Sequence, residues 1–443
     1  MTDVIRYILR FMIGEHLADD VTRFVGYTSD VSLFPDYKVV IVPSGFFDEG
    51  TYGTAKTRPV IPLRSIKKIP FLFGAPDIER IGDTIVVHAD LVASAYFLLS
   101  RYEEILHRDI RDKHGRFPGC KSLPQRAGFI DRPVVDEYGK LLRKCLNDNG
   151  VNVDELFPFI RKINLTHDVD VPFSGRTWRN VARKMLSGRN PVAVIREKYS
   201  PLEQDPYYTF PWMLEQDAIL QRATDADRCQ SLFFFRAGGT ARQDRPHYDL
   251  RGKDIQSLYS LCKQYAVTIG LHSSYQAGIN PSLILSEKRN LEDAFGMEIK
   301  HNRHHFLASR EPEDMEYLEK AGFTDDYTVG YADVAGFRLG TSLPVRYINP
   351  ATRRLSNLML HPLTVMDCTL NEIKYMNLTG DGAEEYCMRL IRHIRDVNGE
   401  LTLLWHNTSA VERHGYLRGL YSKLINHVGC EFHTNIKKQI IHV

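Results

Sequence analysis

The sequence predicts an α/β protein in which a (β/α) barrel follows a smaller α/β domain. From Leu156 onward, short apolar segments alternate with helical patterns, which is typical of a parallel sheet covered by helices. With about seven strands in roughly 285 residues, a barrel is favoured over an open sheet. Several of these strands end in polar residues, as do strands that carry active-site groups.

The smaller domain is expected to occupy residues 1–153. An amphipathic helix is predicted at 2–13, and a helix at 89–107 has Asp90 as its candidate N-cap. The charged residues at 100–104 are expected to face solvent, as most charged side chains do. The other elements expected here are strands at 37–42, 68–73 and 84–88 and a helix at 135–149.

The barrel domain is expected to occupy residues 154–443. The segment 231–235 is continuously apolar, which is typical of a strand buried on both faces. The expected strands are 157–166, 231–235, 267–272, 299–306, 343–348, 358–366 and 401–406. The expected helices are 176–187, 209–222, 253–265, 283–295, 311–320, 383–397 and 416–427.

Composition narrows the classes of function. A formal net charge of +2, from 57 basic and 55 acidic residues, gives no reason to propose nucleic acid as a partner. Seven cysteines without a C-x-x-C pair indicate reduced thiols in place of a disulfide framework or a cysteine zinc site. Without a signal-peptide pattern or an apolar run of ~18 residues, we expect a cytoplasmic protein with no transmembrane segment. The residues leave the oligomeric state open.

The first polar cluster follows the strand predicted at 157–166. His167, Asp168 and Asp170 arrive within four residues. In extended backbone Asp168 and Asp170 share a face, and His167 points the other way unless the backbone turns. Two carboxylates beside a histidine suit a divalent metal and a general base. Alternatively, the aspartates cap the next segment or form an Asx-turn before Pro172.

Two histidines end later strands. His272 ends the strand at 267–272 and is a candidate metal ligand, although a lone histidine can also be a hydrogen-bonded core residue. His406 ends the last strand, in a position that suits a general acid. The alternative for His406 is a core histidine beside Trp405.

The segment 301–306 contains three histidines and an arginine. In a strand, Arg303 and His305 share one face, where Arg303 can hold a carboxylate or orient an acidic residue. The alternative is an exposed edge strand. Arg338, between two glycines, suits contact with a substrate, and Asp367 follows an apolar run. The sequence contains no G-x-S-x-G elbow, P-loop or H-E-x-x-H motif.

Five motifs occur in a fixed order. They are Thr-His-Asp-Val-Asp at 166–170, Leu-His-Ser-Ser-Tyr at 271–275, Arg-His-His-Phe at 303–306, Gly-Phe-Arg at 336–338 and Leu-Leu-Trp-His-Asn at 403–407. Together they resemble the polysaccharide deacetylase superfamily (NodB homology, carbohydrate esterase family 4). The resemblance covers about 156–410 and is greatest to a bacterial branch with an HDVD first motif and an extra N-terminal α/β domain.

The resemblance implies a deformed (β/α)7 barrel that holds one divalent metal ion. It implies Asp168 as the catalytic base, Asp170 and His272 as metal ligands, Arg303 as the residue that steadies the base, and His406 as the general acid. The sequence departs from the family pattern at two positions. Val169 separates the two aspartates, and Gln276 stands where the family has a second histidine.

Because Gln276 leaves the implied ligand set incomplete, His167 and His305 are the candidates to complete it. Zinc is the expected metal, with cobalt, nickel, iron and manganese as alternatives. The predicted reaction is hydrolysis of an N- or O-acetyl group on a sugar or polysaccharide. The alternatives are a catalytically inactive carbohydrate-binding or assembly protein and a hydrolase of a non-sugar amide. The residues expected to contact substrate are Tyr275, Phe306, Trp405, Arg338, Asp326 and Asp367.

Overall fold

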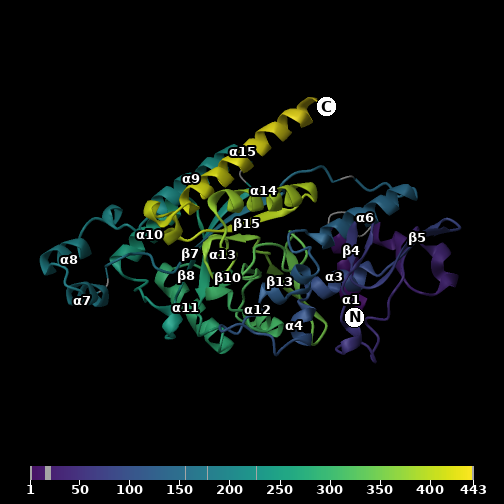
Figure 1. Ribbon diagram of the computed structural model, residues 1–443, viewed down its shortest axis with the longest axis horizontal. Coiled ribbons are helices and arrows are strands. Elements are labelled where there is room, and N and C mark those ends of the chain that lie inside the picture. The colour runs from purple at the N-terminus through teal and green to yellow at the C-terminus, as the bar shows by residue number, and fades with distance from the viewer. Residues whose placement is uncertain (1, 15–20, 155, 177, 226, 442–443) are drawn as a thin grey trace.

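The chain forms two main sheets. The residues that the computed structural model describes are 2–14, 21–154, 156–176, 178–225 and 227–441. They form a four-stranded sheet near the N-terminus, a two-stranded ribbon and a nine-stranded sheet. In Figure 1 the N-terminal elements lie at one end of the molecule, and α7 (Trp178–Leu186) and α8 (Pro191–Lys198) project from the other. Within these ranges, no helix is both long and apolar enough to cross a membrane.

The N-terminal sheet has helices packed against it. The strands of this sheet are β1 (Val25–Tyr27), β2 (Val39–Ile41), β5 (Gly74–Ile81) and β6 (Thr84–Ala89). The helices of the same region include α1 (Thr2–Ile13), α3 (Leu91–Leu99), α5 (Leu123–Arg126) and α6 (Val134–Asp148). The strand order is β1-β2-β6-β5, and only β5 runs antiparallel to its neighbour. The separate ribbon is β3 (Arg64–Ile66) with β4 (Ile69–Phe71). The helices at 2–13 and 135–149 are thus found close to their predicted bounds.

The helix predicted at 89–107 is two helices. The side chain of Asp90 accepts the backbone N–H of Ala93 at 2.9 Å, so the predicted N-cap is confirmed. The helix α3 then ends at Leu99, and α4 (Tyr102–Leu106) follows Arg101, whose φ of 60° lies in the left-handed region. A non-glycine residue in that region interrupts a right-handed helix.

The charged residues at 100–104 are buried, so the expectation that they face solvent is wrong. Arg101 donates to both carboxylate oxygens of Glu104, at 2.9 and 2.6 Å. Arg338, from a loop in the C-terminal part of the chain, donates to Oε1 of Glu104 at 2.8 Å. The three side chains are at most 3% exposed. Glu104 therefore joins the N-terminal elements to the segment that carries Arg338.

The nine-stranded sheet is almost entirely parallel. Its order is β12-β13-β11-β10-β9-β8-β7-β15-β14, and only β12 runs antiparallel to its neighbour. The strands are β7 (Lys162–Val169), β8 (Cys229–Phe235), β9 (Thr268–Ser273), β10 (His301–His304), β11 (Asp325–Asp326), β12 (Val345–Asn349), β13 (Arg354–Leu360), β14 (Val365–Met366) and β15 (Glu400–Leu404).

Most neighbouring strands of the nine-stranded sheet are also consecutive in the sequence, and together they curl into an open ring. The first strand of the sheet, β7, pairs with the last, β15, and the ring stays open between β12 and β14. This curled sheet confirms the predicted fold class, an α/β fold with a deformed barrel after a smaller α/β region. The strand expected at 157–166 begins later, at Lys162, and continues through His167 and Asp168 to Val169. Phe157, in the segment before it, is 74% exposed.

Helices connect most of the successive strands of the nine-stranded sheet, from β7 to β11 and from β14 to β15, and one more helix follows β15. They are α9 (Phe210–Ala223), α10 (Lys253–Gln264), α11 (Ile284–Phe295), α12 (Met315–Lys320), α13 (Asp367–Asn371), α14 (Gly380–Asp396) and α15 (Leu417–Ile441). Such connections place the carboxyl ends of the parallel strands at one rim, where loops can gather functional groups. The helix α8 is an addition to the predicted set.

Candidate active site

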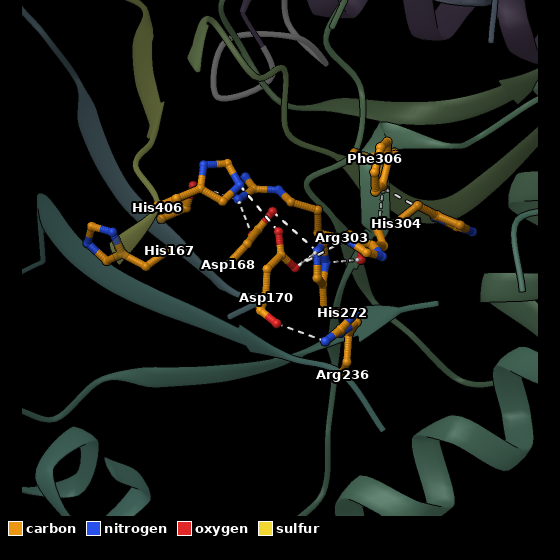
Figure 2. A network of polar contacts seen from close by, with 12 residues as sticks. His167, Asp168, Asp170, Arg236, His272, Arg303, His304, Phe306 and His406 are labelled. Carbon is orange, nitrogen blue, oxygen red and sulfur yellow. Dashed lines mark hydrogen bonds and ion pairs between the residues drawn. The ribbon is translucent and has the colours of Figure 1, made fainter. Parts of the chain in front are cut away.

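The carboxyl end of β7 carries the first predicted cluster. Arg303, in β10, donates from Nη1 to Oγ1 of Thr166 at 2.7 Å and to Oδ1 of Asp168 at 3.0 Å (Figure 2). Because β10 lies three strands from β7, these bonds cross the inside of the curled sheet. Arg303 is fully buried, so its charge depends on the Asp168 carboxylate for compensation.

Asp170, His272 and His305 form a compact group of possible metal ligands. Oδ1 of Asp170 lies 3.1 Å from Nε2 of His272 and 3.4 Å from Nε2 of His305. Oδ1 of Asp170 and Nε2 of His272 are buried and have no hydrogen-bond partner. Two ligand atoms bound at ~2.1 Å to one tetrahedral ion lie about 3.4 Å apart. The three side chains therefore have the spacing of neighbouring ligands of one ion.

Each histidine of this group is held in place by a hydrogen bond at its second ring nitrogen, Nδ1. Nδ1 of His272 lies 2.9 Å from the carbonyl oxygen of Arg303, and Nδ1 of His305 lies 3.0 Å from Oδ1 of Asp244. Metal-binding histidines usually donate their second N–H to a carbonyl or carboxylate in this way. In that tautomer each Nε2 presents a lone pair toward Asp170, which fits a metal site.

The electrostatics of the group also fit a cation. Burial raises the pKa of Asp170, but the neighbouring His305 and His272 outweigh it and hold this pKa well below its usual value. Burial lowers the pKa of His305 and favours its neutral form, whereas at His272 burial is outweighed by the Asp168 and Asp170 carboxylates, which raise the pKa. The ionised Asp170 carboxylate is the form that binds a divalent metal, and metal binding would displace the proton that these carboxylates favour on His272.

His406, after β15, lies on the other side of Asp170. Its Nε2 is 3.6 Å from Oδ2 of Asp170, and its Nδ1 is 2.8 Å from Oδ1 of Asp367. Burial lowers the pKa of His406, but the Asp367 carboxylate outweighs it and raises this pKa well above the usual value. Asp367, expected to contact substrate, is fully buried and holds His406 instead. Sγ of Cys368 lies 3.8 Å from the same Nδ1.

His167 lies outside the candidate metal group, which corrects its predicted role as a ligand. Its Nδ1 is 2.8 Å from the carbonyl oxygen of Trp405, and its Nε2 is 3.1 Å from Oδ2 of Asp217 in α9. Side-chain alternation along β7 turns His167 to the face opposite Asp168, as Figure 2 shows. Both ring nitrogens are engaged there, so neither is left to bind a metal.

Two of the expected substrate residues lie beside the candidate metal group. The ring centroid of Phe306 is 4.7 Å from that of His305 and 5.5 Å from that of Tyr275. His114, from the N-terminal region, packs 5.0 Å from Phe306 and brings Nδ1 to 3.3 Å from the hydroxyl of Tyr275. Aromatic surfaces of this kind can pack against the apolar face of a sugar or acyl group.

The other three expected substrate residues are occupied elsewhere, which corrects those predictions. Arg338 is buried and bound to Glu104 and to the carbonyl oxygen of Gly330. Asp326 is fully buried and accepts Nδ2 of Asn302 at 2.8 Å. Trp405 is fully buried, with its ring 5.2 Å from that of Tyr421. In each case, strand alternation or a neighbouring helix directs the side chain into the core.

Three residues near the site were missed by the sequence analysis. Asp244 orients His305, His114 contacts Tyr275, and Nη2 of Arg236 donates to the carbonyl oxygen of Asp170 at 2.8 Å. His114 lies in a loop, Arg236 follows β8 and Asp244 ends a short 3-10 helix. Neither a motif nor a periodicity identifies any of them. Gln276, at the position of the absent second histidine, accepts the backbone N–H of Thr240 and takes no part in the group.

The N-terminal region matches one family model. Residues 2–150 match the family described as a family of unknown function (DUF7033). No curated protein matches the chain.

Three solved structures are similar to part of the chain. A Mycobacterium smegmatis protein assigned to the polysaccharide deacetylases is 15% identical, with a TM-score of 0.38, and the match covers 62% of this chain and 86% of that one. Puue allantoinase is 15% identical, with a TM-score of 0.36 and coverage of 63% and 89%. A mutant CE4-family pseudoenzyme with restored enzymatic activity is 13% identical, with a TM-score of 0.30 and coverage of 61% and 64%.

Proposed function

We propose that the protein is a metal-dependent hydrolase that removes an N- or O-acetyl group from a sugar or polysaccharide. The observation that carries this proposal is the group of Asp170, His272 and His305 between two further ionisable residues. Asp168 lies on one side, with Oδ2 3.5 Å from Nε2 of His272, and His406 lies on the other. A metal site flanked by a carboxylate and a protonated imidazole has the parts required for acyl hydrolysis.

Asp170, His272 and His305 would hold the metal, for which zinc is the first candidate. Two imidazole nitrogens and one carboxylate are a ligand set typical of catalytic zinc, which keeps a position open. When bound there, the ion would polarise the acyl carbonyl and lower the pKa of water.

Asp168 and His406 have complementary roles in this proposal. Asp168 accepts a proton from the attacking water at Oδ2, because Oδ1 accepts the hydrogen bond from Arg303. The water oxygen forms a bond to the acyl carbon, and the bond from that carbon to the leaving nitrogen or oxygen breaks. His406 gives its Nε2 proton to the leaving atom, because Nδ1 is held by Asp367. The products are acetate and the free amine or alcohol.

The choice of an acetylated sugar rests on the sequence resemblance and on the aromatic wall formed by Tyr275, Phe306 and His114. A non-sugar amide would undergo the same reaction with the same residues. The third candidate function is a carbohydrate-binding protein without catalysis, which is favoured by the absence of a histidine at Gln276. Metal content separates this candidate from both hydrolases.

The experiment measures metal and acetate on the full chain. We expect about one divalent ion per chain and acetate release from acetylated amino sugars after loading with Zn²⁺ or Co²⁺. Asp168→Asn should keep the metal and lose turnover by about 100-fold or more, since general bases contribute that much. If the purified chain binds no divalent ion, the non-catalytic candidate is correct. If it binds metal but releases amine without acetate from another amide, the sugar assignment is wrong.

A further inference from the structure

The helical hairpin of α7 and α8, residues 178–199, is inserted after the β7 segment that carries Asp168 and Asp170. Figure 1 shows it projecting from the body of the molecule at the end opposite the N-terminal sheet. It contains six arginines and lysines and one acidic residue, Glu197, whereas the whole chain has a formal net charge of only +2. We refer to residues 178–199 as the basic hairpin.

The basic hairpin exposes apolar side chains. Leu186 is 89% exposed, Val192 is 74% exposed and Trp178 is 61% exposed. Val192, Ile195 and Tyr199 recur with the spacing of one helical face. Other apolar side chains of the hairpin are buried, since Val181 and Val194 are only 2% and 1% exposed. The exposed apolar face is therefore a feature of a folded hairpin.

The base of the basic hairpin is attached to the body. The Arg176 guanidinium, just before α7, lies 3.3 Å from the Asp254 carboxylate of α10 and 3.7 Å from the Asp205 carboxylate. Within the hairpin, Lys184 and Arg189 both pair with Glu197. Arg183 and Arg196 are exposed and add positive charge beside the apolar face. The positive charge and the exposed apolar side chains of the hairpin therefore lie together, and the ion pairs of Arg176 attach the hairpin to the body.

We propose that the basic hairpin docks the protein on an anionic lipid surface. Lysine and arginine near such a surface each contribute about 1 kcal/mol, and exposed leucine and valine gain from insertion at the acyl boundary. Tryptophan and tyrosine, here Trp178 and Tyr199, favour the interface between headgroups and acyl chains. An acidic protein surface would match the same charge, but the exposed Trp178 and Tyr199 beside basic residues favour a lipid interface.

The position of the basic hairpin relates it to the candidate active site. A cavity of about 1040 Å³ is lined by Trp178 and Tyr199 of the hairpin and by Tyr248. Tyr248 also lines a smaller cavity of about 310 Å³ that includes Arg236, whose Nη2 binds the carbonyl oxygen of Asp170. Docking would therefore bring the larger cavity, which the hairpin itself lines, close to the lipid surface. The docking proposal itself does not depend on the proposed hydrolase activity.

Co-sedimentation of the full chain with vesicles tests the proposal. We expect binding to vesicles that contain phosphatidylglycerol, little binding to pure phosphatidylcholine, and release as salt screens the charges. Arg183→Gln with Arg196→Gln should weaken binding by about tenfold or more, from two charges at about 1 kcal/mol each. Leu186→Asn with Val192→Asn should also weaken it, because both side chains would enter the lipid interface.

A matched control is the pair Val60→Asn and Arg64→Gln, which changes an exposed valine and arginine of the N-terminal region. This pair should bind vesicles like the unchanged chain, and circular dichroism should show that all variants are folded. Equal binding by the control and hairpin variants would overturn the proposal. So would sedimentation-velocity data in which the unchanged chain is a dimer and Leu186→Asn a monomer, because the hairpin would then be an interface between copies.

Discussion

The imidazole of His406 and the fully buried carboxylate of Asp367 form a hydrogen-bonded pair, with Nδ1 of His406 2.8 Å from Oδ1 of Asp367. Oδ2 of Asp367 also accepts the backbone N–H of His406 at 2.7 Å. The two bonds fix both the position of the residue and the orientation of its ring. They leave Nε2 directed toward Asp170, which lies 3.6 Å away.

Asp367→Asn should move the pH dependence of turnover. The Asp367 charge is the main contribution that raises the pKa of His406 against the effect of burial, so its removal lowers that pKa. Because a general acid must be protonated, the alkaline limb of kcat against pH should shift to lower pH. Turnover at pH 8 should fall by about 100-fold.

The control for this prediction is Cys368→Ser, which alters an uncharged contact of the same ring. An unshifted alkaline limb in Asp367→Asn would exclude His406 as the acid.

His305→Gln should reduce the affinity for the divalent ion by about 100-fold or more, because it removes one of three proposed ligands. His167→Gln provides the comparison, since His167 bonds to Trp405 and Asp217 outside the group. Competition with a chromophoric chelator measures both affinities. Retention of metal by His305→Gln together with its loss from His167→Gln would reverse the assignment.

Glu104→Ala should lower the free energy of unfolding by about 3–5 kcal/mol, because it leaves the buried guanidinium groups of Arg101 and Arg338 without their carboxylate. Glu137→Ala breaks the more exposed pair with Arg132 and should cost about 1 kcal/mol or less. Urea unfolding of the two variants measures the difference. Equal losses would mean that the buried charges find other partners.

Glu103→Gln should flatten the dependence of stability on pH. Burial raises the pKa of Glu103 to about 7, above its value in the unfolded chain. The folded state then holds a proton that the unfolded state releases, so stability is greatest at low pH and is lost as pH rises through 7. This contribution is at most about 3 kcal/mol between pH 5 and 7. Urea unfolding at several pH values should show a smaller decrease in Glu103→Gln than in the unchanged chain, and parallel curves would refute the assignment.

Much of the fold could be predicted because it depends on local patterns. The apolar segments 231–235 and 401–404 lie in strands of the ring, although the second was expected to reach 406, and the capping aspartate Asp90 begins α3 as expected. The helix break at Arg101 could not be predicted, because the left-handed backbone there accompanies a buried ion pair with Glu104 that forms only in the folded chain.

The candidate site was predictable where residues lie on strands. Alternation along β7 separated His167 from Asp168, and Arg303 of β10 reaches Asp168 across the sheet. The aspartate that orients His305, Asp244, comes from a short 3-10 helix between β8 and α10. Phe306 has a φ of 62° after β10, so the backbone at His305 leaves the strand geometry on which the sequence prediction relied. Contacts between segments that are far apart in the sequence leave no local sequence pattern from which they could be predicted.

The pairing of β7 with β15 affects how the nascent chain can fold. Asn164 and Thr402, whose side chains are hydrogen-bonded, are 238 residues apart in the sequence. At about 5–20 residues per second, the ribosome needs roughly 10 to 50 seconds to synthesise that interval. During this time one edge of β7 lacks its native neighbour, although β8 is already available on the other. An unpaired edge can recruit strands from other chains. Production of the intact protein should therefore be more sensitive to translation rate and to chaperone supply than its stability after folding would indicate.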